Sequence, residues 1–133
     1  MAFGNSHGAM NDKDLFLGYI KAYNAKDVSG MLTFFDEDCV LETISAGKVT
    51  VHTKGKAELE ALARKSADAF ASREQKVISL TQRQERVVAE IDYLAVLRVD
   101  LTHDLKAGSE LKLRGISVCE FSGGRIVRLS DYS

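Results

Sequence analysis

The stretch VVAEIDYLAVLRVDL, residues 87–101, decides the fold of this chain, because its apolar residues alternate over a length that only a strand explains. Two further stretches of the same kind follow it, LKLRGISVCEF at 111–121 and RIVRLSDY at 125–132. Glycine-containing turns separate the three, at Lys106-Ala107-Gly108 and at Ser122-Gly123-Gly124. Turns of this type join neighbouring strands into hairpins. We therefore expect an antiparallel meander, with a shorter strand at 77–82 before it.

Helical periodicity precedes these strands. Three helices are expected: the first ends at Asn24, the second is capped by Asp27, and the third begins after Gly55. Short strands at 39–45 and 49–52 are expected between the second and third helices. The apolar stripes of the helices are Leu15, Phe16, Tyr19, Ile20 and Tyr23; Val28, Met31, Leu32 and Phe35; and Leu59, Leu62, Ala63, Ser66 and Phe70. Helices followed by hairpin-joined strands predict an α+β fold, with the three helices on one face of a strongly curved antiparallel sheet.

The composition narrows the classes of partner. With 133 residues the chain is expected to form one domain, residues 12–133, after a disordered tail at 1–11. The 18 basic and 19 acidic residues are spread through the sequence, which argues against nucleic acid and against a membrane surface as partners. No apolar run is long enough to span a membrane.

Cysteine and histidine give no pattern typical of a metal or cofactor site. Cys39 and Cys119 fall in predicted strands without the spacing of a metal-binding or redox motif, so buried free thiols and a cytoplasmic location are favoured over a disulfide or a metal pair. His52 and His103 have no second ligand at metal spacing. We expect neither a metal nor a cofactor.

Polar residues at the ends of two strands suggest a site. Arg98 and Asp100 share one face of the long strand, and Asp131 lies in the last strand, so two carboxylates and a guanidinium could meet in one pocket. The opposite face is then expected to form a symmetric homodimer contact: Ala89, Ile91, Tyr93, Ala95, Leu97, Val99 and Leu101. Two plainer interpretations stay open: a solvated Arg98–Asp100 pair on the outer face, and an exposed Asp131 near the chain end.

The order of four motifs resembles the nuclear transport factor 2-like superfamily, which includes SnoaL-like polyketide cyclases, ketosteroid isomerases and limonene-1,2-epoxide hydrolases. The motifs are YIKAYNAKD at 19–27, FFDEDCV at 34–40, GKAEL at 55–59 and GRI at 124–126, and the resemblance extends over about residues 14–133. It implies a cone-shaped sheet wrapped around the helices and enclosing a pocket for a small apolar or hydroxylated molecule. The epoxide hydrolases are the most similar, through Arg98-Val99-Asp100, Gly108, Gly124-Arg125-Ile126 and Asp131-Tyr132.

That resemblance implies a mechanism without a cofactor. Asp131 would be the general base on a water, Asp100 the acid that protonates the epoxide oxygen, and Arg98 the bridge between them. The expected ligand pocket holds Tyr19, Thr43, Phe70, Leu113 and Ser117.

The chain also departs from the families that it resembles. Leu41 and Thr43 stand where the epoxide hydrolases have a water-holding Tyr and Asn. Ser117 stands at the usual His of the cyclases, and Thr43 and Ser117 at the base and acid of the isomerases. Epoxide hydrolysis is favoured, and two alternatives remain: a cyclase- or isomerase-type proton transfer, and a non-catalytic module for ligand binding or dimerisation.

Overall fold

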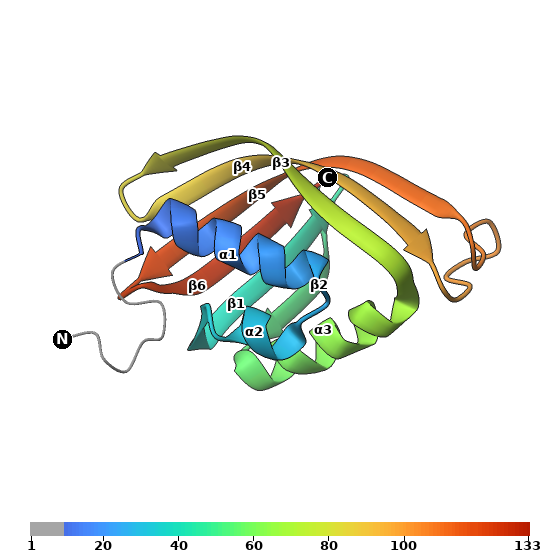
Figure 1. The fold of residues 1–133 in the computed structure, drawn as a ribbon, viewed down its shortest axis with the longest axis horizontal. Coiled ribbons are helices and arrows are strands. Elements are labelled where there is room, and N and C mark those ends of the chain that lie inside the picture. Colours follow the sequence, from blue (N-terminus) through green and yellow to red (C-terminus); the bar gives the residue numbers. More distant parts are fainter. Residues whose placement is uncertain (1–9) are drawn as a thin grey trace.

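Six strands form one curved sheet, and three helices lie within its curve (Figure 1). The structure is a computed structural model that describes residues 10–133. The strand order is β2-β1-β6-β5-β4-β3. The elements are α1 (Asp12–Asn24), α2 (Val28–Leu32), β1 (Phe35–Ser45), β2 (Lys48–Lys54), α3 (Lys56–Ala69), β3 (Phe70–Arg83), β4 (Arg86–Leu97), β5 (Glu110–Ser122) and β6 (Arg125–Tyr132). The predicted α+β class, with three helices before a meander, is confirmed.

Side-chain hydrogen bonds hold both ends of α1 and the start of α2. The Asn11 side chain accepts a hydrogen bond from the Asp14 amide at 2.9 Å, and the Asp27 side chain accepts one from Gly30, also at 2.9 Å. Asn11, the last residue of the expected tail at 1–11, thus caps α1, which begins at Asp12; residues 1–9 of that tail lie outside the described residues. The Asn24 amide pairs with both backbone polar groups of Gln75, at 3.0 and 2.8 Å, which attaches the end of α1 to β3.

The sheet differs from the predicted meander in two respects. β1 pairs with β6 in parallel, whereas all other neighbours are antiparallel. A short turn forces an antiparallel pair, but β1 and β6 are far apart in sequence, so no turn constrains their direction. β3 also begins at Phe70, directly after α3, and not at 77. The turn between β5 and β6 is as predicted: Gly123 and Gly124 have φ of +59° and +77°, which favours glycine.

The two faces of β4 are the reverse of those predicted. Ala89, Ile91 and Leu97 are at most 4% exposed and belong to the inner face, which packs on the helices, whereas Val88 and Leu94 on the outer face are 37% and 40% exposed. The inner residues are therefore not a surface for a second subunit, because helices of the same chain already cover them. Alternation decides which residues share a face, and a shift of one residue moves every side chain to the other face.

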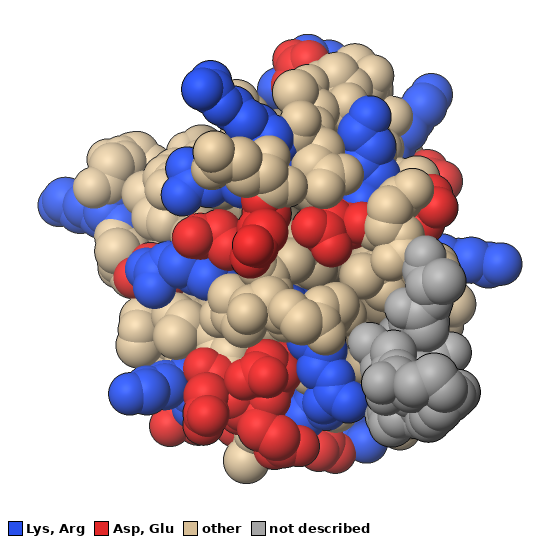
Figure 2. All heavy atoms as spheres, turned by 90° about the vertical axis from the view of Figure 1, so that its left-hand side faces the viewer, with Lys and Arg blue, Asp and Glu red and all other residues tan. Residues whose placement is uncertain are grey.

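Charged side chains are mixed over the surface. Figure 2 shows one end of the molecule, where acidic and uncharged side chains separate the basic ones. None of the helices within residues 10–133 is long and apolar enough to cross a membrane. Cys39 and Cys119 are buried free thiols, as predicted. In the same residues no group of three or more His, Cys, Asp or Glu side chains is placed to hold a metal ion.

Candidate functional site

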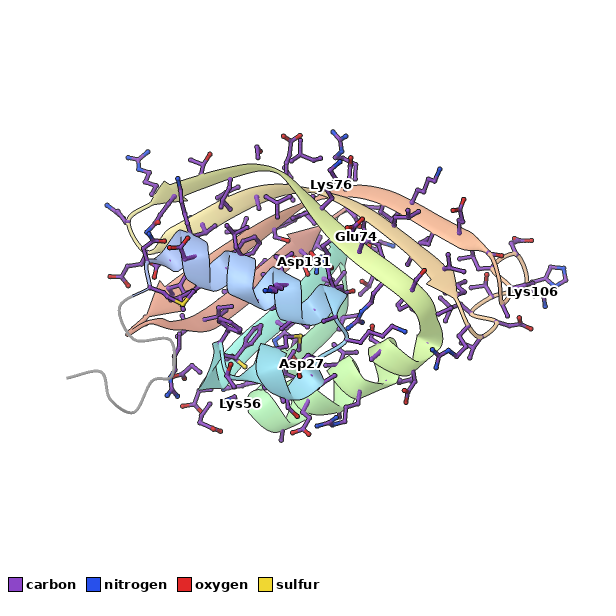
Figure 3. All side chains as sticks on the ribbon, in the orientation of Figure 1. Asp27, Lys56, Glu74, Lys76, Lys106 and Asp131 are labelled. Atoms are coloured by element: carbon purple, nitrogen blue, oxygen red, sulfur yellow. The ribbon has the colours of Figure 1, made fainter. Side chains whose placement is uncertain are left out.

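The register of three strands places three polar side chains in one row. Asp131 on β6 lies opposite Thr43 on β1 and opposite Ser117 on β5. Directly opposed residues of paired strands project to the same face, so all three side chains belong to the inner face. Figure 3 shows Asp131 in the middle of the molecule, close to α1. Because β6 is paired on both sides, Asp131 is held firmly only two residues from the end of the chain.

Two adjoining cavities meet at this row. The helix-side cavity, of about 220 Å³, lies between the helices and the sheet, and the sheet-side cavity, of about 200 Å³, lies among β3 to β6 and the C-terminus. Tyr23, Thr43 and Asp131 line both cavities. The other residues around the helix-side cavity are mostly apolar: Tyr19, Met31, Phe35, Leu41, Val51, Leu59, Leu62, Ala63, Ser66, Arg73 and Leu129. Asp131 is thus a carboxyl group at the junction of two largely apolar spaces.

The surroundings of Asp131 change its acidity. Burial raises the pKa of its carboxyl from 3.8 to about 6, and the hydrogen bond from Ser117 acts in the opposite direction. Ser117 Oγ donates to Asp131 Oδ1 at 2.6 Å, which leaves the second carboxylate oxygen for a ligand. Within residues 10–133 no basic side chain forms an ion pair with Asp131. A carboxyl with a pKa near neutrality can both accept and return a proton.

Three phenols line the same two cavities as the carboxyl of Asp131. Burial, and next the charge of Asp131, raise the pKa of Tyr19. Tyr23 and Tyr93 share a hydrogen bond of 3.0 Å between their hydroxyl oxygens, and burial is the largest cause that raises the pKa of each. These hydroxyls therefore stay protonated at neutral pH and act as hydrogen-bond donors, and not as bases; in the Tyr23–Tyr93 pair one hydroxyl already donates to the other.

Arg73 is a cavity residue that the sequence analysis missed. It lies on β3, is 6% exposed and lines the helix-side cavity. Because the strand was expected to begin at residue 77, Arg73 was placed before it. The signal that could have found it is the two-residue spacing of Arg73, Gln75 and Val77, all of which project inward.

The expected cluster of Arg98, Asp100 and Asp131 is not assembled. β4 ends at Leu97, and both Arg98 and Asp100 are exposed in the loop after it. Asp100 accepts a hydrogen bond from the Ala107 amide at 2.8 Å and forms an ion pair with Lys106 at 3.8 Å. Figure 3 shows Lys106 at the far end of the molecule from Asp131. Both residues are solvated, as in the plainer interpretation, but they lie in the loop after β4 and not on its outer face, and Asp100 pairs with Lys106 and not with Arg98.

Four of the five expected ligand-pocket residues line the cavities. Tyr19 lines the helix-side cavity, Leu113 and Ser117 line the sheet-side cavity, and Thr43 lines both. Phe70 lines neither; it packs edge-on against Tyr93, with ring centroids 6.3 Å apart. The expectation for Phe70 was wrong because this residue begins β3 and does not extend the apolar stripe of α3.

Comparison with known proteins identifies the family. The model of the SnoaL-like domain matches residues 16–129. The chain belongs to the SnoaL-like domain family. No protein with a curated description matches it.

Solved structures share the fold of this SnoaL-like domain. Two are each named a putative polyketide cyclase. The one from Xanthomonas campestris pv. campestris has 23% identity and a TM-score of 0.79, with 92% of this chain and 89% of that chain covered. The one from Pseudomonas putida KT2440 has 22% identity and a TM-score of 0.76, with 94% and 92% covered. TerC, co-crystallised with polyporic acid, has 15% identity and a TM-score of 0.72, with 90% and 88% covered. The predicted fold family is thus confirmed, whereas the finer resemblance to epoxide hydrolases stays a prediction.

Proposed function

We propose that this SnoaL-like domain catalyses proton transfer at a carbon next to a carbonyl group, without a cofactor, and that Asp131 is the general base. The observation that carries the proposal is the carboxyl of Asp131 itself, which lies in an apolar cavity with a pKa of about 6 and no basic partner among residues 10–133. Such a group is ionised at neutral pH and more basic than an ordinary aspartate, as a general base requires.

The arrangement supports a short reaction sequence. The ionised Asp131 removes a proton from the substrate carbon, and the electron pair moves onto the carbonyl oxygen to form an enolate. The hydroxyl of Tyr19, whose pKa responds to the charge of Asp131, donates a hydrogen bond to that oxygen. Ser117 holds the carboxylate in position through Oδ1. The protonated Asp131 then returns the proton.

Where the proton returns determines the product. Return to a different carbon completes an isomerisation. If the enolate carbon instead attacks a second carbonyl of the same molecule, a new carbon–carbon bond closes a ring, and the resulting alkoxide takes the proton from Asp131. The two solved structures named putative polyketide cyclases, and a protein from Catenulispora acidiphila described as having a ketosteroid isomerase-like fold, make these two outcomes the first to test.

Epoxide hydrolysis is the second candidate, because Asp131 could also activate a water. The chemistry expected from the resemblance needs a second acid and a bridging arginine, and the structure leaves Asp100 and Arg98 exposed. Leu41, which lines the helix-side cavity, has no group to hold a water. Binding of a small molecule without turnover is the third outcome that an experiment must distinguish.

Hydrogen exchange in D₂O followed by NMR tests the proposal directly. Small cyclic and aryl ketones, with and without a carboxylate group, serve as substrates, and a panel of cyclic epoxides is assayed beside them. We expect the wild type to accelerate exchange at the carbon next to the carbonyl, and Asp131→Asn to lower the rate at least about a hundredfold. Asp92→Asn is the matched control, because Asp92 pairs with Arg114 on the outer face.

The outcomes separate the candidates. Exchange that is no faster than in buffer across the panel, or that is unchanged in Asp131→Asn, refutes the proposal. Turnover of epoxides that is lost in both Asp131→Asn and Asp100→Asn supports the hydrolase, since only that mechanism uses Asp100. Ligand binding with no turnover of either panel supports a binding module.

We also propose that the outer face of the sheet forms a homodimer contact. Val88, Leu94 and Ile116 are 37%, 40% and 44% exposed on this face. Arg114 and Asp92 lie beside them and pair with each other, so this part of the face presents a neutralised ion pair to a second copy. Light scattering at micromolar concentration is expected to give a dimer in the wild type and a monomer in Leu94→Asp. A monomeric wild type contradicts this proposal.

The cytoplasmic location also stays a proposal. Its support is the pair of buried free thiols, Cys39 and Cys119, which suit a reducing compartment. Fractionation of the source cells tests the location, and recovery of the protein outside the cytoplasm contradicts it.

A further inference from the structure

Arg73 is a buried cation without an anionic partner. Its side chain is 94% buried, and none of the ion pairs within residues 10–133 includes it. A buried charge is expensive unless an opposite charge or a full set of hydrogen bonds compensates it. The proposed proton transfer makes no use of Arg73, so its place in the cavity needs another explanation.

The contacts of Arg73 fix its position but do not neutralise it. Nε and Nη2 donate to the backbone oxygen of Tyr23 at 3.3 and 3.2 Å, and Nη1 donates to Ser66 Oγ at 3.1 Å. The guanidinium carbon lies 3.8 Å from the centre of the Tyr23 ring. All of these partners are uncharged. Three of the five N–H groups are used, which leaves one on Nη1 and one on Nη2.

The neighbouring charges add to the positive potential at this end of the cavity. Lys26 donates from Nζ to the backbone oxygens of Phe70 and Ala71, the start of the strand that carries Arg73. Desolvation is the largest cause that lowers the pKa of Lys26, and repulsion from Arg98 and then Arg73 lowers it further. Among residues 10–133, Asp68 is the acidic group that acts on Lys26 in the opposite direction.

We propose that the helix-side cavity binds a small aromatic or apolar molecule that carries a carboxylate, and that the guanidinium of Arg73 binds this carboxylate. Two N–H groups on separate nitrogens of one planar fork match the two oxygens of a carboxylate. The apolar lining of the cavity suits the rest of the molecule.

The position of Asp131 indicates which part of the bound ligand reacts, and this step rests on the proposed function. Arg73 and Asp131 both line the helix-side cavity, and no ion pair within residues 10–133 joins them, so each can act on a different part of one ligand. The substrate class is therefore a keto acid whose carboxylate binds at Arg73 and whose reactive carbon lies next to Asp131.

Binding of a matched ligand pair tests the carboxylate site separately from catalysis. The probes are 2-naphthoate and the neutral 2-naphthamide, which have nearly the same shape, measured by calorimetry at pH 8. We expect the wild type to bind naphthoate at least about tenfold more tightly, and Arg73→Gln to reduce this preference below about twofold. Arg114→Gln, on the outer face, is the matched control and should keep the preference. Asp131→Asn removes a negative charge from the same cavity and should keep or increase the preference for naphthoate, so a failure of the proposed catalysis leaves this result intact.

A measurement on the wild type covers the case in which Arg73→Gln fails to fold. The Nε–H resonance of Arg73, assigned by its loss in Arg73→Lys, should shift on addition of naphthoate and much less on addition of naphthamide. Three results overturn the proposal: equal affinity of the wild type for both probes, an unchanged preference in a folded Arg73→Gln, or no binding of either probe in the millimolar range.

Discussion

Replacement of Asp131 by Asn is expected to stabilise the fold at pH 8 and to leave its stability nearly unchanged at pH 4. The carboxyl has a pKa of 3.8 in a model peptide and of about 6 in the fold, because burial disfavours its charged form. The folded state therefore holds the proton more tightly than the unfolded state. In the wild type, the stability that the protonated carboxyl of Asp131 contributes is fully present below about pH 4 and is lost as the pH rises through 6.

The size of the effect follows from the two pKa values. Their difference corresponds to about 3 kcal/mol in the free energy of unfolding above pH 7. Asn has a similar shape, carries no charge, and can still accept the hydrogen bond from Ser117. The variant is therefore free of the penalty that the ionised carboxylate imposes, and we expect it to be more stable than the wild type by about 3 kcal/mol at pH 8.

Urea denaturation at pH values from 4 to 8 measures this difference. Contributions from the other titrating groups are common to both proteins and cancel when the two free energies of unfolding are subtracted. The difference should grow with pH and reach half its full value near pH 5, midway between the two pKa values. Asp92→Asn, an exposed replacement of the same kind, should show no such growth. A difference between the wild type and Asp131→Asn that does not change with pH would refute the assignment of a buried, proton-holding carboxyl to this position.

The remaining predictions concern the neighbours of Asp131 and the register of β4. Ser117→Ala removes the hydrogen bond that lowers the pKa of Asp131, so the midpoint of the rate against pH in the exchange assay should move above 6. Tyr19→Phe should lower the exchange rate about tenfold to a hundredfold with little change in ligand affinity, because it removes a hydrogen bond needed by the enolate. Leu97→Ala should destabilise the fold by about 2–5 kcal/mol in urea denaturation, since Leu97 is 1% exposed. Val96→Ala, on the outer face, should cost less than about 1 kcal/mol; equal effects at 96 and 97 would contradict the observed register.

The local elements were predictable because short-range patterns specify them. The stripe from Leu15 to Tyr23 gave α1, Asp27 capped α2 as expected, and the glycines of the β5–β6 turn fell where positive φ is needed. The order of these elements also predicted the α+β class and the family. Asp131 was found for a different reason: it lies in a predicted strand, and the family resemblance implies a general base at its position.

The tertiary structure alone decided which face of β4 points inward, where that strand ends, and which charges share the cavity. The alternation of side chains along β4 predicts that Ile91 and Leu97 lie on one face. Only the packing of helices from the same chain buries that face and leaves Leu94 exposed. The Arg98–Asp100 pair looked like a site because it continues the alternation past Leu97, the last residue of β4. Arg73 reaches the cavity through pairing of β3 with β4 and through its hydrogen bonds to Tyr23 on α1, 50 residues away, and to Ser66 on α3. Short-range patterns carry no information on such long-range contacts, and these contacts determine which side chains meet.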